Sequence, residues 1–227
     1  MGRKYYEAYD DRYRQIHGQG LRWFADAPTA IVQQTIEKYK ITRSHKLLEL
    51  GCGEGRDAFP LLQDGFDLLA TDISEAAISY CQRKEPKHAN SFRVLDCVAG
   101  VTDQKFDFIY AVAVIHMLVP YEDRNAFYTF IRNHLKPNGI ALICTMGDGE
   151  LERQTDIRTA FDLQDRTHEQ TGREVRIAST SCRMVSFPTF ESELSRSGLT
   201  ILEKGLTKAE PDFSSLMYAV VTTDKEK

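Results

Sequence analysis

Residues 46–57 constrain the fold of this chain more than any other stretch, and they read Lys-Leu-Leu-Glu-Leu-Gly-Cys-Gly-Glu-Gly-Arg-Asp. The first five predict a short apolar strand interrupted only by Glu49, and a glycine then stands at every second position, at Gly51, Gly53 and Gly55. Glycine adopts positive φ without strain and lets the backbone approach a ligand closely. Apolar residues at helical spacing follow, up to Gly65, which is typical of a helix C-terminus. The stretch therefore predicts a strand, a tight turn and a helix that together cradle a nucleotide.

Two kinds of nucleotide cradle use this design. The dinucleotide fold requires Gly-x-Gly-x-x-Gly, and a match that starts at Gly51 would need a glycine where Arg56 stands. The second kind carries an acidic residue on the strand, followed by alternating glycines, and Glu49 with the three glycines fits it. At this point the chain resembles the class I S-adenosylmethionine (SAM)-dependent methyltransferases of the small-molecule type. The resemblance covers residues 46 to about 145 well and the remainder in outline.

The resemblance implies an α/β fold: a Rossmann-like three-layer sandwich whose seven-stranded sheet is mostly parallel, with the last strand antiparallel and inserted beside the sixth. The apolar periodicity predicts the strands themselves, at residues 46–50, 66–71, 92–96, 106–114, 140–145, 199–205 and 214–222. Besides the helix after the glycine turn, helices are expected at residues 26–39, 75–85 with Ser74 as N-cap, 123–135, and 187–197 with Thr189 as N-cap.

Two acids stand at the ends of predicted strands. A carboxylate at Asp72, beside the glycine turn, can accept hydrogen bonds from both hydroxyls of a ribose. Asp72 lies 21 residues after Gly51, so it would also serve a dinucleotide, and a helix cap or surface acid is the alternative interpretation. The resemblance implies that Asp96 accepts from the exocyclic amine of adenine, while the backbone N–H of Cys97 reaches a ring nitrogen.

The resemblance also implies the cofactor, SAM, and its product, S-adenosyl-L-homocysteine (SAH). Glu49 and the backbone of the turn are expected at the methionine end of the cofactor. The full set of expected cofactor-binding residues is Glu49, Gly51, Cys52, Gly53, Gly55, Arg56, Asp72, Ile73, Asp96, Cys97 and Ala111. No metal ligands are expected, since the cysteines and histidines show no metal-binding spacing.

His116 is the candidate catalytic residue. It follows the fourth predicted strand, at the sheet edge where ligands of open α/β sheets bind, and an unperturbed histidine has a pKa of about 6.5. The alternative is a histidine that only shapes the pocket. Methyl transfer depends mainly on positioning and needs a base only where the acceptor must lose a proton, so no catalytic triad is expected.

The chain is interpreted as one methyltransferase domain, 1–227, with two additions. Residues 1–40 are expected to form a helical lid segment, because Tyr5, Tyr9 and Tyr13 fall at helical spacing, although an aromatic face that merely packs would look the same. Residues 146–186 are expected to be an insertion that caps the substrate, or a solvated surface helix. Their arginines would suit an anionic acceptor, but acids are interleaved with them.

The composition of the chain disfavours some classes of substrate and binding partner. A net charge of −4 disfavours a nucleic-acid substrate, and there is no Asn/Asp-Pro-Pro-Tyr/Phe or Pro-Cys motif of nucleic-acid methylases. Five scattered cysteines and strand-sized apolar runs favour a reduced, cytoplasmic protein without membrane attachment. The sequence thus predicts methyl transfer to an O, N or S atom of a small molecule. RNA or protein methylation, a non-catalytic nucleotide-binding module and an oxidoreductase remain alternatives; neither the acceptor nor the oligomeric state is indicated.

Overall fold

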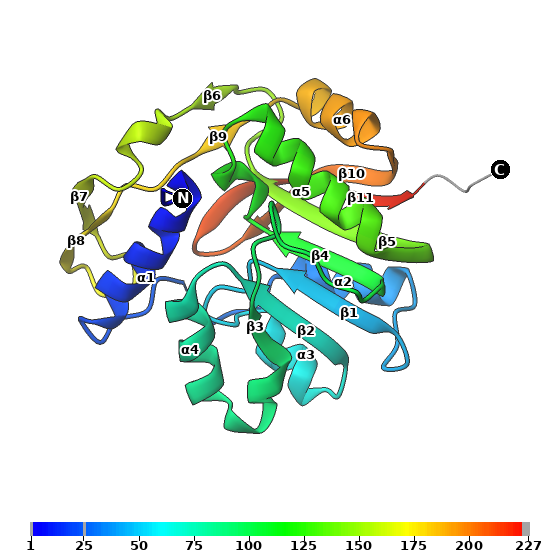
Figure 1. Cartoon of the computed structure of the whole chain (residues 1–227), viewed down its shortest axis with the longest axis horizontal. Helices are drawn as coiled ribbons and strands as arrows, with labels where there is room; N and C mark the ends of the chain where they lie inside the picture. Colours follow the sequence, from blue (N-terminus) through cyan, green and yellow to red (C-terminus); the bar gives the residue numbers. More distant parts are fainter. Residues whose placement is uncertain (1, 25, 224–227) are drawn as a thin grey trace.

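A seven-stranded sheet forms the centre of the computed structural model, which describes residues 2–24 and 26–223. The sequence Asp-Lys-Glu-Lys at 224–227 predicts a frayed tail, and these residues lie outside the described ones. The strand order of the sheet is β10-β11-β5-β4-β1-β2-β3 (Figure 1). The strands are β1 (Lys46–Leu50), β2 (Asp67–Asp72), β3 (Phe92–Val94), β4 (Phe106–Val112), β5 (Leu135–Met146), β10 (Leu199–Ala209) and β11 (Phe213–Thr223). All neighbouring pairs are parallel except the two that involve β11, which lies antiparallel between β5 and β10. The expected Rossmann-like fold is confirmed.

Helices cover both faces of the sheet because every central strand is apolar on both faces. One buried cluster joins the sheet to α2 (Ala30–Lys38), α3 (Ala58–Gln63) and α4 (Glu75–Lys84). A second cluster joins the opposite face to α5 (Tyr121–His134) and α6 (Phe187–Arg196). Short 3-10 turns complete these layers, η2 (Pro86–Ser91) before β3 and η3 (Ile115–Met117) after β4.

Most of the predicted helices and strands are found, and the predictions are wrong mainly about where these elements begin and end. The third strand stops at Val94 rather than at residue 96, because its partner β2 ends at Asp72, which pairs with Val94. The last helix is capped by Ser186, whose hydroxyl accepts from the N–H of Thr189, so Thr189 as N-cap was wrong. Ser74 is the N-cap of α4, as predicted, and accepts from the N–H of Ala77.

The two additions pack against each other above the carboxyl ends of the strands. Of the first, expected at residues 1–40, η1 (Tyr5–Glu7) and α1 (Ala8–His17) lie there, whereas α2 within the same bounds packs on a face of the sheet. The second forms two small ribbons around η4 (Ile157–Thr159), so the surface helix considered for it is not found: β6 (Arg153–Gln154) pairs with β9 (Arg183–Met184), and β7 (Leu163–Thr167) pairs with β8 (Glu174–Ala178). Ile16 of α1 packs on Val175 and Ile177 of β8, and Figure 1 shows α1 beside this ribbon.

Within the part of the chain that the structure describes, no helix is both long and apolar enough to cross a membrane.

Candidate active site

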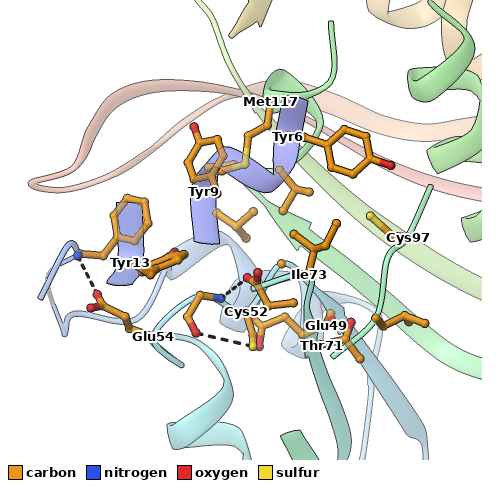
Figure 2. A pocket seen from close by; sticks show the side chains of 18 of the residues that line it. Tyr6, Tyr9, Tyr13, Glu49, Cys52, Glu54, Thr71, Ile73, Cys97 and Met117 are labelled. Carbon is orange, nitrogen blue, oxygen red and sulfur yellow. Dashed lines mark hydrogen bonds between the residues drawn. The ribbon is translucent and has the colours of Figure 1, made fainter. Parts of the chain in front are cut away.

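A cavity with about 920 Å³ of empty space, partly open to solvent, lies between the glycine turn and α1. We call it the donor cavity. Nine of the eleven expected cofactor-binding residues line it, namely Glu49, Gly51, Cys52, Gly53, Arg56, Asp72, Ile73, Asp96 and Cys97. Figure 2 shows Glu49, Cys52, Ile73 and Cys97 along its floor and side, with tyrosines of the N-terminal segment above them.

The glycine turn takes a conformation that other residues would strain. Gly51 and Gly53 have φ of 72° and 51°. A Cβ on Gly51 would stand 2.4 Å from a methyl of Val114, and one on Gly53 would stand 2.6 Å from the hydroxyl of Tyr13. Glycine is therefore required here for both backbone freedom and close packing. Gly55 also has positive φ, but it packs against the Phe59 ring behind the turn and does not line the donor cavity.

Asp72 ties the turn to the end of β2. Its carboxylate accepts from the N–H of Gly53 and from the N–H of Ser74, both at 2.8 Å. The side chain is only 8% exposed, and burial raises its pKa to about 6, although both N–H groups act in the opposite direction. A carboxylate has about four lone-pair positions, so Asp72 retains acceptor capacity toward the cavity.

Asp96, just beyond β3, is engaged by the N-terminal segment. Lys4 Nζ donates to it at 2.9 Å, the Tyr6 hydroxyl at 3.2 Å and the N–H of Val98 at 2.8 Å. Burial alone would raise the pKa of Asp96, but the hydrogen bonds from Lys4 and the backbone lower it overall. The acid expected at the adenine end therefore stays ionised and holds residues 4–6 over the cavity.

Glu49 and Arg56 lie at the opposite end. The Tyr110 hydroxyl donates a hydrogen bond to Glu49 at 3.0 Å. Burial raises the pKa of Glu49 well above its usual range, and the negative charge of Asp57 adds to this effect. A ligand ammonium beside Glu49 would favour the ionised carboxylate again. Arg56 forms an ion pair with Asp212 at 3.3 Å, between β10 and β11.

Two further predicted site residues, Ala111 and the candidate catalytic residue His116, do not line the donor cavity. Ala111 is 1% exposed and packed in the sheet core. His116 is 2% exposed and lines a second cavity that adjoins the first. Burial lowers its pKa to about 3, and the positive charges of Arg124 and Arg12 add to the effect. His116 is thus neutral at physiological pH and is a much weaker base than the unperturbed side chain considered from the sequence.

Glu54 is a site residue that the sequence reasoning missed, although it lies inside the glycine motif. It is 2% exposed and accepts from the N–H groups of Trp23 and Phe24, at 3.0 and 2.9 Å. His17 Nε2 lies 2.8 Å from the same carboxylate. Figure 2 shows Glu54 directed at this segment. The Glu54 carboxylate thus holds the chain after α1 against the glycine turn. The sequence feature that could have identified Glu54 as a site residue is its position between Gly53 and Gly55.

Replacing Glu54 with alanine is expected to release residues 17–24, because three hydrogen bonds to one buried carboxylate are lost. Charge-assisted hydrogen bonds contribute about 1.5–3 kcal/mol each. The amide protons of Trp23 and Phe24 should therefore exchange at least tenfold faster, which hydrogen exchange with mass spectrometry measures. Glu122→Ala, which removes an exposed acid from α5, is the control. Unchanged exchange in Glu54→Ala would show that apolar packing alone holds the segment.

A family profile described as "Methyltransferase domain" matches residues 48–141, which run from β1 into β5. The chain is 28% identical over 121 residues to a ubiquinone biosynthesis O-methyltransferase of Rickettsia prowazekii, covering 51% of this chain and 46% of that protein. It is 30% identical over 117 residues to the probable S-adenosyl-L-methionine-dependent methyltransferase TehB of Haemophilus influenzae, covering 51% and 41%. The chain thus spans about half the length of the curated relatives it matches.

Among solved structures, the glycopeptide N-methyltransferase MtfA complexed with sinefungin has a TM-score of 0.64 at 19% identity, covering 88% of this chain and 87% of that one. At this identity the likeness concerns the fold alone.

The sheet order and the glycine turn define a Rossmann-like α/β protein, and its donor cavity lies at the carboxyl edge of the sheet, where ligands of open α/β sheets bind. Residues 48–141 match the methyltransferase-domain profile, and the curated relatives matched over about half of this chain are named as methyltransferases, one of them as probably S-adenosyl-L-methionine-dependent.

Proposed function

We propose that this protein transfers the methyl group of SAM to an O, N or S atom of a small-molecule acceptor. The observation that carries the proposal is the glycine turn held by Asp72 at the wall of the donor cavity. The residues suit each part of SAM: Asp72 for the ribose hydroxyls, Asp96 for the adenine amine, Ile73 for an apolar ring face, and Glu49 for the ammonium group.

The chemistry requires little from the side chains beyond position. SAM supplies a methyl group on a positively charged sulfur, and displacement by an electron-rich acceptor removes that charge. Holding two reactants in line contributes up to about 7–11 kcal/mol to lowering the barrier. The cavity walls, including Tyr9, Tyr13 and Met117, would orient the reactants and exclude water. Neutral His116 would form a hydrogen bond with an acceptor rather than act as a strong base.

The N-terminal segment is proposed as the lid of this site. Tyr6, Tyr9 and Tyr13 line the donor cavity, and Lys4 and Glu54 fasten the two ends of the segment. Residues 146–186 are proposed as the substrate cap, since Arg166 and His168 line the second cavity. A cytoplasmic location is supported by the five cysteines, all of them unpaired.

The pH dependence of SAH binding should report the ionisation of Asp72. Ribose hydroxyls donate more strongly to a carboxylate than to a carboxylic acid. Since the pKa of Asp72 is about 6, affinity should be full above pH 7 and fall as the pH drops through 6. At pH 5 only about a tenth of Asp72 would be ionised, so the dissociation constant should rise about tenfold. Calorimetric titration at pH 7.5 and 5 measures this, and Asp72→Asn should remove the difference. A flat profile in the wild type would contradict ribose binding by Asp72.

Thermal shift with SAH and with NAD tests the function itself. A ligand at a hundred times its dissociation constant adds about 2.7 kcal/mol, which corresponds to roughly 5–10 °C for a domain of this size. We expect this shift with SAH and none with NAD. A shift with NAD alone would assign the glycine turn to a dinucleotide and overturn the proposal.

A further inference from the structure

A second cavity, with about 790 Å³ of empty space, adjoins the donor cavity. The two share the lining residues Tyr9, Phe24, Met117 and Phe213. The labelled Tyr9 and Met117 in Figure 2 stand on this common wall. We call the second space the arginine cavity, after Arg12 and Arg166 in its lining.

Arg12 is a buried cation that forms no ion pair with a carboxylate of the described residues. It is 5% exposed, and its guanidinium donates to the carbonyls of Ala178 and Ser179 at 2.9 and 2.6 Å. The rings of Tyr9 and Trp23 flank it at 5.0 and 4.8 Å. Among residues 2–24 and 26–223, no Asp or Glu lies within 4.0 Å of its nitrogens. A buried charge without an opposite charge is costly, so a guanidinium in a cavity wall that meets only carbonyls and aromatic rings points to an anionic ligand.

Arg166 adds a second positive charge to the same wall. It lies on β7 and is exposed, and in the described part of the chain it too forms no ion pair. Burial lowers the pKa of Arg12, and the charge of Arg166 lowers it further, which reflects their closeness. The cavity also contains two acids, but Asp212 is paired with Arg56, and Glu169 is exposed. Two arginines are therefore available to one anion.

The rest of the lining is suited to a planar group and a hydrogen bond. Trp23, Phe24 and Phe213 contribute aromatic rings. His116 contributes a buried Nδ1 that has no hydrogen-bond partner among the described residues. A buried nitrogen without a partner costs about 1–3 kcal/mol, which a polar group of a ligand would offset.

We propose that the arginine cavity is the acceptor site and that it selects a small, planar acceptor bearing an anionic group, a carboxylate or a phosphate. Arg12 and Arg166 bind the anion, and His116 Nδ1 holds a polar group of the acceptor near the wall shared with the donor cavity. The assignment of this space to the acceptor rests on the proposed methyl transfer, whereas anion selection can be measured without turnover.

The test is a fluorine NMR titration of the full chain, with and without saturating SAH. The probes are 4-fluorobenzoate, its neutral isostere 4-fluorobenzamide, and 4-fluorophenyl phosphate. The wild type should bind at least one anion five or more times more tightly than the amide, and the preferred anion distinguishes carboxylate from phosphate. Arg166→Gln should weaken that anion at least fivefold and leave the amide unchanged. Arg176→Gln, an exposed arginine on β8 outside the cavity lining, should bind every probe as the wild type does.

The outcomes separate this inference from the proposed function. Equal binding of anion and amide, binding of neither anion at millimolar concentration, or an unchanged anion affinity in Arg166→Gln would overturn the inference. Binding of SAH is measured in the same samples, and its absence would overturn methyl transfer instead. Because Arg166 is exposed, Arg166→Gln is expected to fold, and the SAH affinity of that variant verifies it.

Discussion

Replacing Asp72 with alanine is expected to weaken the binding of SAH about 100-fold, which corresponds to about 2.7 kcal/mol. Two losses combine in this variant. The ribose hydroxyls lose a carboxylate acceptor, and charge-assisted hydrogen bonds are about twice as strong as neutral ones. The N–H groups of Gly53 and Ser74 also lose their acceptor, so the glycine turn is no longer tied to β2. Isothermal titration calorimetry at pH 7.5 measures the change.

Asp67→Ala is the matched control, because Asp67 is an exposed aspartate at the other end of the same strand. It should bind SAH with wild-type affinity. Asp72→Asn keeps one acceptor oxygen and should fall between the two. If Asp72→Ala bound SAH within threefold of the wild type, the ribose would not lie at Asp72 and the placement of the cofactor would be wrong.

Glu193→Ala is expected to destabilise the fold by about 3–5 kcal/mol, because it leaves Arg124 as an unpaired buried charge. Arg124 is fully buried, and Glu193 accepts from its Nε and Nη2 at 2.9 and 2.6 Å. The Tyr128 hydroxyl donates to the same carboxylate at 3.0 Å. The midpoint of thermal unfolding should fall by about 6–20 °C in a domain of this size. Urea unfolding measures the free energy directly.

Two further variants separate charge from packing in this pair. Tyr128→Phe removes one hydrogen bond and should cost about 1–2 kcal/mol. The double variant Arg124→Met with Glu193→Leu should cost less than Glu193→Ala, because it leaves no buried charge unpaired. A double variant less stable than Glu193→Ala would show that the bonds from Arg124 to the Ile115 and Leu118 carbonyls dominate instead.

The pair also affects the site. Through the Ile115 and Leu118 carbonyls, Arg124 holds the turn η3 that carries His116, and its charge contributes to lowering the pKa of that histidine. Variants of this pair should therefore change the arginine cavity as well as stability. For this reason the experiments on the acceptor use Arg166, which takes no part in the pair.

Local patterns in the sequence were sufficient to predict the glycine turn, β1, the end of β2 at Asp72 and the N-cap of α4 at Ser74. Each of these depends on residues close in sequence: apolar runs, glycines that permit positive φ, and a hydroxyl that accepts from an N–H three residues on. The mostly parallel sheet, with its last strand antiparallel and inserted beside the sixth, followed from the resemblance that these patterns revealed. The end of β3 was misjudged because a strand stops where its partner stops, and the length of β2 is not encoded in β3.

The sequence by itself thus determined the strands and the nucleotide cradle, since both arise from short-range geometry, and through the family resemblance of these motifs it also indicated the Rossmann-like fold. Only the tertiary structure decided how the site is enclosed. Lys4 meets Asp96 across 92 positions, and Glu54 holds Trp23 from 31 positions away. Burial decided that His116 is neutral, and packing left Arg12 without a carboxylate partner among the described residues. Such contacts and desolvation depend on which distant segments pack together, and that is the physical reason why no local pattern predicted them.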